Sequence, residues 1–147
     1  MLKSVMRVLG VGAVFAAGVW AGQWLQVTPV EAQSAPKVFE LRTYVSPPGK
    51  LDDLHARFRN HTVKLFEKHG MTNVGYWVPQ DAPRKDNTLI YIVSHESREA
   101  AARNWKAFSS DPEWQKVRTA SEIDGPIVQK GGVESVFLTA VDYSAIK

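Results

Sequence analysis

A short segment of the sequence places a glutamate, an arginine and a tyrosine at alternate positions. They are Glu40, Arg42 and Tyr44, in the run KVFELRTYV. Alternate side chains of a β-strand point to the same face of a sheet, so a strand here brings the three together. The planar fork of an enclosed arginine binds a carboxylate or an enolate, and a tyrosine hydroxyl donates to a developing oxyanion. The spacing therefore predicts a site that stabilises negative charge on a small molecule, with Arg42 and Tyr44 as candidate catalytic residues.

His61 is the candidate proton acceptor of such a site. It lies beside the apolar stripe of a predicted helix, where a neutral imidazole would reach the boundary between helix and sheet. A boundary histidine that bonds to the backbone is the alternative. The four histidines show neither HxH nor HExxH spacing, and the chain has no cysteine. We therefore expect no metal site and no cofactor.

Aromatic residues on neighbouring elements are candidates for the lining of a ligand pocket. In an antiparallel sheet, Tyr91 and Phe137 would lie near the arginine. Either Tyr76 or Trp77 would join them, and the register that decides between these two stays open. Trp105 has the helical spacing of a core residue, and its indole could also line the mouth of a cavity. The predicted ligand-binding residues are therefore Glu40, Tyr76, Trp77, Tyr91, Trp105 and Phe137.

The elements that must position these residues follow from hydrophobic periods of two and 3.6. Strands are predicted over residues 37–45, 71–79, 88–94 and 133–142, and helices over residues 50–69 and 97–109 and from Asp111 onward. The order is β-α-β-β-α-β, with the second helix split. It is typical of a ferredoxin-like α+β fold, in which a four-stranded antiparallel sheet carries its helices on one face.

The two faces of the first strand differ in composition, because Phe39, Leu41, Thr43 and Val45 alternate with the glutamate, arginine and tyrosine. We expect the Phe39 face to meet the helices. The arginine face would lie open, since large aromatics beside an Arg–Glu pair are too polar for a plain core and too apolar for a solvated surface. Arginine and aromatic residues are enriched at protein interfaces. This composition predicts a homodimer whose sheets enclose a cavity, and an Arg–Glu pair that only fixes the dimer register is the alternative.

Composition excludes several classes of function. The 147 residues carry a formal charge of +3 with bases and acids interspersed, which is no footprint for nucleic acid. Without cysteine there is no disulfide, thiolate metal site or cysteine nucleophile. The sequence also holds no nucleophile elbow, phosphate loop or dinucleotide fingerprint, which disfavours acyl, phosphoryl and nicotinamide chemistry.

The start of the chain differs from the remainder. A basic beginning precedes an uncharged run, VLGVGAVFAAGVWAG, whose length is typical of the apolar h-region of a signal peptide, with cleavage sites after Ala32 or Ala21. We expect residues 1–32 to be a cleaved signal peptide or an uncleaved anchor, followed by a linker over residues 33–36. Either predicts a periplasmic or secreted domain over residues 37–145, which meets a membrane only through an uncleaved leader.

Several motifs across the mature domain resemble the NIPSNAP domain family. They occur in the family's order: Phe39-Glu40-Leu41-Arg42-Thr43-Tyr44, Pro48-Gly49-Lys50-Leu51, His69-Gly70-Met71, Val74-Gly75-Tyr76-Trp77, Asn87-Thr88-Leu89-Ile90-Tyr91, Trp105 with Phe108, Asp111-Pro112-Glu113-Trp114, and Asp142-Tyr143-Ser144. One departure is Ser94-His95-Glu96, where relatives tend to have a tyrosine followed by an acid. The resemblance implies a dimeric α/β barrel, in which two ferredoxin-like protomers close their sheets on each other.

The resemblance leaves several functions open. The NIPSNAP family has no agreed reaction, and its wider superfamily includes cofactor-free monooxygenases, haem-degrading enzymes and isomerases. We expect a homodimer with an aromatic and arginine-lined pocket for a small organic ligand. The alternatives are a cofactor-independent monooxygenase or isomerase that uses Arg42, Tyr44 and His61, and a structural or assembly module. A cavity above ~300 Å³ where these residues converge would favour a ligand, and a filled interior would favour the module.

Overall fold

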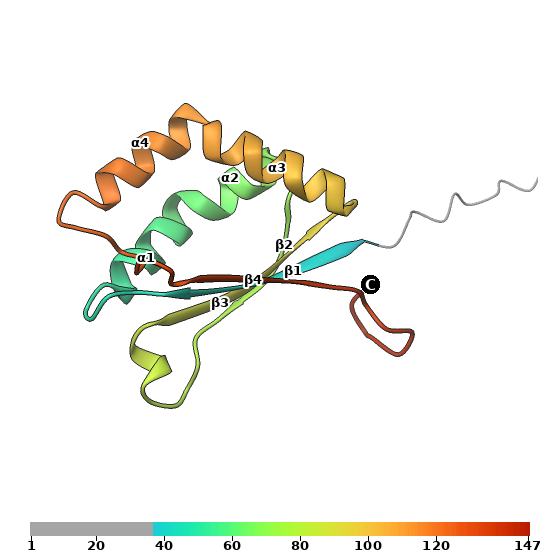
Figure 1. The fold of residues 1–147 in the computed structure, drawn as a ribbon, viewed down its shortest axis with the longest axis horizontal. Coiled ribbons are helices and arrows are strands. Elements are labelled where there is room, and N and C mark those ends of the chain that lie inside the picture. Colours follow the sequence, from blue (N-terminus) through green and yellow to red (C-terminus); the bar gives the residue numbers. More distant parts are fainter. Residues whose placement is uncertain (1–36) are drawn as a thin grey trace, which may run out of the picture. The chain divides into compact units, whose positions relative to one another are not determined.

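The computed structural model describes residues 37–147, in which a layer of helices covers one face of a sheet (Figure 1). The strands are β1 (Val38–Val45), β2 (Thr72–Trp77), β3 (Thr88–His95) and β4 (Val133–Leu138). The helical segments are α1 (Leu51–Arg57), the π-helix η1 (Phe58–Thr62), α2 (Val63–Lys68), the 3-10 helix η2 (Arg84–Asp86), α3 (Arg98–Ser110) and α4 (Pro112–Ser121). The predicted leader and linker lie outside the described residues.

The first helical run, from α1 through η1 to α2, is continuous, as the sequence predicts. It ends at Gly70, whose φ of 75° is a left-handed conformation that glycine adopts without strain. Its apolar stripe faces the sheet, and every member is buried or half-buried: Leu51, Leu54, Phe58, Thr62 and Leu65.

The second helical run consists of two helices, and a side chain caps the start of each. The hydroxyl of Ser97 accepts a hydrogen bond from the backbone N–H of Ala100, and the carboxylate of Asp111 accepts one from that of Glu113. Both bonds satisfy donors that a helix start leaves without an intrahelical partner. The helix therefore breaks at Asp111 into α3 and α4, as predicted.

The strand order is β2-β3-β1-β4, and every neighbouring pair is antiparallel. With the βαββαβ connectivity, this order confirms the predicted ferredoxin-like α+β fold. The register places Tyr91 opposite both Arg42 and Tyr76, and Phe137 opposite Glu40. The register also decides between Tyr76 and Trp77, because Tyr76 lies on the same side of the sheet as Arg42.

The orientation predicted for the two sheet faces is wrong, because the arginine face lies under the helices. Tyr44 contacts Phe58 of η1, with ring centroids 5.9 Å apart, and Trp105 of α3 bonds to Glu40. The expectation treated an Arg–Glu pair as too polar for a core. A buried carboxylate is tolerated when donors surround it, and Glu40 has four. Apolar side chains line the face without helices: Phe39, Leu41, Ile90, Ile92, Val136 and Leu138.

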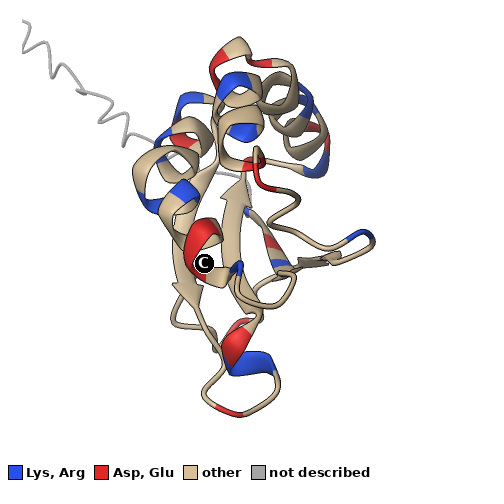
Figure 2. Cartoon of the chain, turned by 90° about the vertical axis from the view of Figure 1, so that its left-hand side faces the viewer, with Lys and Arg blue, Asp and Glu red and all other residues tan. Residues whose placement is uncertain are grey.

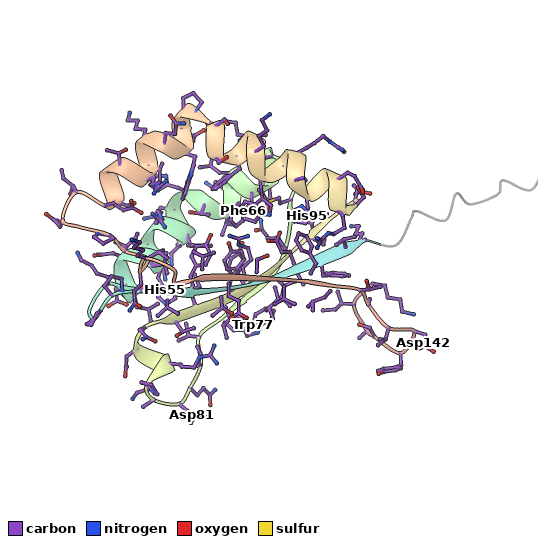
Figure 3. All side chains as sticks on the ribbon, viewed as in Figure 1. His55, Phe66, Trp77, Asp81, His95 and Asp142 are labelled. Atoms are coloured by element: carbon purple, nitrogen blue, oxygen red, sulfur yellow. The ribbon has the colours of Figure 1, made fainter. Side chains whose placement is uncertain are left out.

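An aromatic core fills the space between the helices and the sheet. Phe66 of α2 is 1% exposed and lies at its centre (Figure 3). Its ring centroid lies between 5.0 and 6.1 Å from those of Phe58, Tyr91, Trp105 and Phe108. Edge-to-face and stacked contacts of this kind stabilise a core beyond its area burial.

The edge strand β4 is shorter than the sequence predicts. The strand ends at Leu138, and the predicted strand continues to Asp142. Beyond it the chain turns, and the hydroxyl of Ser144 accepts a hydrogen bond from the backbone N–H of Ile146 at 3.3 Å. Residues 139–142 do not pair with β1, so the ladder between β1 and β4 ends at Leu138.

Charged residues are interspersed over the helices and loops (Figure 2). Lysines and arginines alternate with acids along the helical layer, without a stripe of one sign in that view. Within residues 37–147, no helix combines the length and the apolar character needed to cross a membrane.

Phe66→Ala tests whether the Phe66 ring is central to the aromatic core. We expect the substitution to lower the free energy of unfolding by about 4 kcal/mol, because it removes a fully buried aromatic side chain and leaves a cavity. Tyr143→Ala is the matched control, since Tyr143 is 86% exposed, and it should change stability by less than ~0.5 kcal/mol. Urea unfolding at fixed protein concentration measures both, and equal losses would contradict the assigned core.

Candidate functional site

The carboxylate of Glu40 forms the centre of a polar cluster under the helices. Its Oε1 atom accepts hydrogen bonds from Arg42 Nη1 and Ser135 Oγ, both at 2.6 Å. Its Oε2 atom accepts from Trp105 Nε1 at 2.6 Å and contacts His95 Nε2 at 3.1 Å. Burial by itself raises the pKa of Glu40, but these four hydrogen bonds outweigh burial and lower it to about 2. The carboxylate is therefore ionised and fully occupied at neutral pH.

Arg42 lies between this carboxylate and two aromatic rings. Its guanidinium carbon is 4.2 Å from the ring centroid of Trp105 and 5.5 Å from that of Tyr44. Nη2 is 3.4 Å from the Tyr44 hydroxyl, and Nε is buried without a hydrogen-bond partner within residues 37–147. The side chain keeps 14% of its surface exposed. Arg42 thus presents a fixed cation with donor capacity that the protein does not use.

Two further tyrosines, Tyr91 and Tyr76, lie on the arginine side of the sheet. Tyr91 is directly opposite Arg42 on β3, and its buried hydroxyl has no hydrogen-bond partner among the described residues. Burial raises the pKa of Tyr91 well above its usual value, Tyr44 raises it further, and Arg42 opposes the rise. Tyr76 donates its hydroxyl to Asn73, and burial followed by the charge of Glu67 raises its pKa as well. Tyr91 and Tyr76 therefore stay protonated at neutral pH and can donate but not act as bases.

His95 belongs to this cluster, although it is not among the site residues predicted from the sequence. Its side chain is fully buried, and Asn104 Nδ2 lies 3.4 Å from Nδ1 while Nε2 faces Glu40. A donor at Nδ1 leaves the proton on Nε2, where it points to the carboxylate. The signal was available in the period-two alternation of Leu89, Tyr91 and Val93, which continues to His95 on the helix-facing side of β3.

The structure gathers most of the predicted site residues around Arg42. Tyr44, Tyr91 and Trp105 touch or face it, and Tyr76 stacks on Tyr91 with ring centroids 5.5 Å apart. Phe137 lies opposite Glu40 at the β4 edge, where the guanidinium carbon of Arg98 is 3.5 Å from its ring centroid.

Trp77 and His61 do not reach the cluster. Trp77 is 50% exposed and pairs with Ile90 on the opposite face of the sheet, because the next residue along a strand points the other way. His61 is exposed on η1 and lines a cleft against α4. Its neighbour Thr62 takes the inward position of the helical stripe, which turns the imidazole outward. The predicted convergence of His61 with Arg42 is therefore wrong.

The interior around Arg42 is filled by aromatic rings. Four surface clefts of the described chain are lined by residues other than Glu40, Arg42, Tyr44 and Tyr91. The cluster borders solvent at β4, where the exposed Ser135 hydrogen-bonds Glu40. Residues 37–147 contain no group of three histidine or acidic side chains placed to hold a metal ion.

The sheet order, the connectivity and the helix-covered cluster define an α+β protein of the ferredoxin-like class. A sequence model described as NIPSNAP matches residues 39–145. The chain therefore belongs to the NIPSNAP family.

Solved structures are similar to this chain in fold. A NIPSNAP family protein of unknown function from Agrobacterium tumefaciens is 18% identical, with a TM-score of 0.65 over 77% of this chain and 96% of that chain. An uncharacterized NIPSNAP-like domain protein from Burkholderia xenovorans is 19% identical, with a TM-score of 0.63 over 75% and 90% of the two chains. A cofactor-independent oxygenase from Streptomyces nogalater is 17% identical, with a TM-score of 0.47 over 72% and 94%. The comparison with curated proteins found no match.

Glu40→Gln tests the electrostatics of the cluster. The folded-state pKa of Glu40 is about 2 and its ordinary value is 4.5, so its contribution is complete above pH 4.5 and is lost as the pH falls toward 2. We expect the wild type to exceed the variant in unfolding free energy by about 3 kcal/mol at pH 7, with the difference shrinking below pH 4.5. Urea unfolding from pH 7 to pH 2 measures it. The exposed Glu96→Gln should follow the wild-type profile, and a pH-independent gap for Glu40→Gln would contradict the assignment.

Proposed function

We propose that this NIPSNAP protein is an exported homodimer that binds a small organic anion at Arg42, beside the tyrosines Tyr44 and Tyr91. The predicted leader at residues 1–32 supports export of the domain over residues 37–145. The ligand is an aromatic or other planar acid whose carboxylate or enolate oxygen meets the guanidinium. Its apolar part contacts the rings beside the arginine.

The observation that carries this proposal is a pair of unsatisfied buried polar atoms. Arg42 Nε and the Tyr91 hydroxyl both lack hydrogen-bond partners within residues 37–147, and they belong to residues directly opposite each other on β1 and β3. A buried polar group without a partner costs about 1–3 kcal/mol. An anionic oxygen between them would satisfy both donors and recover this cost.

The protonation states indicate what the site does with an anion. Glu40 is ionised and holds four donors, His95 has partners at both ring nitrogens, and the buried tyrosines stay protonated. The cluster therefore offers a cation and hydroxyl donors but no base. Such an arrangement binds a carboxylate or stabilises an enolate. A cofactor-independent monooxygenase or isomerase on this site would use Arg42 and Tyr44 for charge stabilisation, with the proton acceptor supplied by the substrate or solvent.

A structural or assembly module is the second candidate, and the filled interior favours it. The Glu40 network joins β1, β3, β4 and α3 through its own hydrogen bonds, so it holds the fold together without a ligand. In that case Arg42 serves the protein only through its bonds to Glu40 and Tyr44 and its contact with the Trp105 ring. The two candidates differ in whether an anion stabilises the protein through Arg42.

Thermal unfolding of the full chain with benzoate and with its neutral analogue benzamide tests the site. We expect benzoate to stabilise the protein by about 2.7 kcal/mol at 100 times its Kd, and benzamide to do so far less, because only the carboxylate pairs with the guanidinium. Arg42→Met should abolish the benzoate effect. Arg98→Met is the matched control, since Arg98 stacks on Phe137 but does not bond Glu40.

Two results would overturn the ligand site. The first is an equally small rise of the unfolding temperature with benzoate and with benzamide in the wild type. The second is an undiminished benzoate shift in a folded Arg42→Met protein. Quinones and haem screened in the same way extend the test to other planar ligands, and a response to none of them would favour the assembly module.

The face of the sheet away from the helices supports the homodimer. It carries apolar residues of all four strands, among which Trp77, Val136 and Leu138 are 50%, 42% and 36% exposed. A contiguous exposed apolar surface of this kind marks an interaction site. A second copy offers the same surface, and a two-fold axis lets the two sheets cover each other.

Val136→Lys tests this interface. Val136 lies near the middle of β4 and is already 42% exposed, so the lysine should leave the protomer folded and weaken dimerisation at least tenfold by burying a charge. Sedimentation equilibrium of the full chain measures the dissociation constant. Ile123→Lys is the control, because Ile123 is an 82% exposed hydrophobic residue after α4, away from the sheet. A monomeric wild type, or equal effects of both substitutions, would contradict the interface.

A further inference from the structure

A cleft with a volume of about 620 Å³ lies between the first helical run and α4. Its walls come from α1 and η1 on one side and from α4 and the residues after it on the other. The cleft shares no lining residue with the Arg42 cluster. Its volume falls within the range of pockets that take small molecules.

Arg57 is the buried cation of this cleft. The residue is 5% exposed, and its Nη1 atom donates to Glu122 Oε1 at 2.9 Å and to Ser121 Oγ at 3.3 Å. Its guanidinium carbon is 5.1 Å from the ring centroid of Trp114. The Nε atom is buried and has no hydrogen-bond partner in the described part of the chain. The protein therefore pairs only part of this guanidinium.

Two of the three acids that line the cleft are paired with lysines. Among the acids that line the cleft, Asp53 pairs with Lys50 and Glu113 with Lys68, each at 3.0 Å. Lys116, Asn60 and His61 also line it, and none forms a hydrogen bond or ion pair with a side chain of residues 37–147. Asp124 is the remaining lining acid. An anionic group is thus the chemical class that these donors recognise.

The remainder of the cleft is apolar. Ala56 from α1 faces Val117 and Ala120 from α4, and Ile123 borders them with 82% of its surface exposed. A large aliphatic side chain exposed to that degree beside unused donors fits a ligand that joins an anionic head to a short hydrocarbon part.

The π-helix η1 shapes the wall that carries Asn60 and His61. It begins next to Arg57, whose carbonyl accepts a hydrogen bond from the Thr62 hydroxyl at 3.2 Å. π turns are rare within helices and occur frequently at functional sites. Here the turn places two polar side chains on the cleft beside the buried arginine.

We propose that this cleft is a second binding site, for a small aliphatic carboxylate whose head meets Arg57 and Lys116 and whose chain lies on Val117 and Ile123. The site goes beyond the proposed function, because it uses other residues and another ligand shape. It binds its acid whether or not the Arg42 site takes an aromatic anion.

NMR of the ¹⁵N-labelled full chain separates the two sites, because each has its own indole N–H reporter. Trp114 lies against Arg57, whereas Trp105 donates its N–H to Glu40. Titration with hexanoate should shift the Trp114 signal and leave that of Trp105 in place. Hexanamide and inorganic phosphate should bind at least about tenfold more weakly, since each lacks one half of the ligand.

Substitutions on the exposed rim complete the test without disturbing the buried arginine. We expect Lys116→Ala to weaken hexanoate about tenfold and Ile123→Ser about fivefold, through the lost ion pair and the lost apolar contact. Lys106→Ala removes an exposed lysine of α3 that lies outside the cleft, and it should leave the affinity unchanged.

Three results would overturn this inference. They are an unshifted Trp114 signal, equal binding of hexanoate and hexanamide, and unchanged affinity in both rim variants. When the Trp114 signal does not shift, a shift of Trp105 that disappears in Arg42→Met would place the acid at the Glu40 cluster and support the proposed function. Binding at Trp114 that persists in Arg42→Met supports the second site, whatever the outcome for benzoate.

Discussion

The buried carboxylate of Glu40 is the interaction on which the site and its surroundings depend. Glu40 is 1% exposed, and an ionised group at that depth is destabilising by several kcal/mol unless donors surround it. The donors come from β1, β3, β4 and α3: Arg42, His95, Ser135 and Trp105. Because the carboxylate needs all of them in place, it fixes three strands and a helix in one arrangement and holds the guanidinium of Arg42 against the Trp105 indole.

This constraint also determines what Arg42 offers to a ligand. Glu40 takes one guanidinium nitrogen, so the charge is partly balanced while Nε stays unpaired, and Tyr91 lies directly opposite on β3. Tyr91 is protonated and the carboxylate of Glu40 is occupied, which makes the cluster a set of donors. Arg57 repeats this pattern on the other side of the helical run, where Glu122 holds one nitrogen and the remaining donor capacity borders an open cleft.

Local sequence was enough to predict most of the elements and much of the cluster. Ser97 and Asp111 cap helices because their short side chains satisfy nearby backbone donors, and the period of two in KVFELRTYV predicts β1. Glu40, Arg42 and Tyr44 share a face for the same reason. The prediction that His61 lies at the site was wrong, since the next residue, Thr62, takes the inward position in the π turn. His95, at the end of β3, was not predicted as a site residue.

The sequence by itself determined the order of the elements, the family, and which residues of each strand lie on the same face. Only the tertiary structure decided which face the helices cover, because an alternating pattern is the same seen from either side of the sheet. It also decided that Tyr76 and not Trp77 meets Tyr91, since register depends on contacts between strands distant in sequence. The arginine face is the covered one because four donors from separate elements satisfy Glu40 there. Those elements are distant in sequence, so no local pattern of residues predicts that their side chains converge.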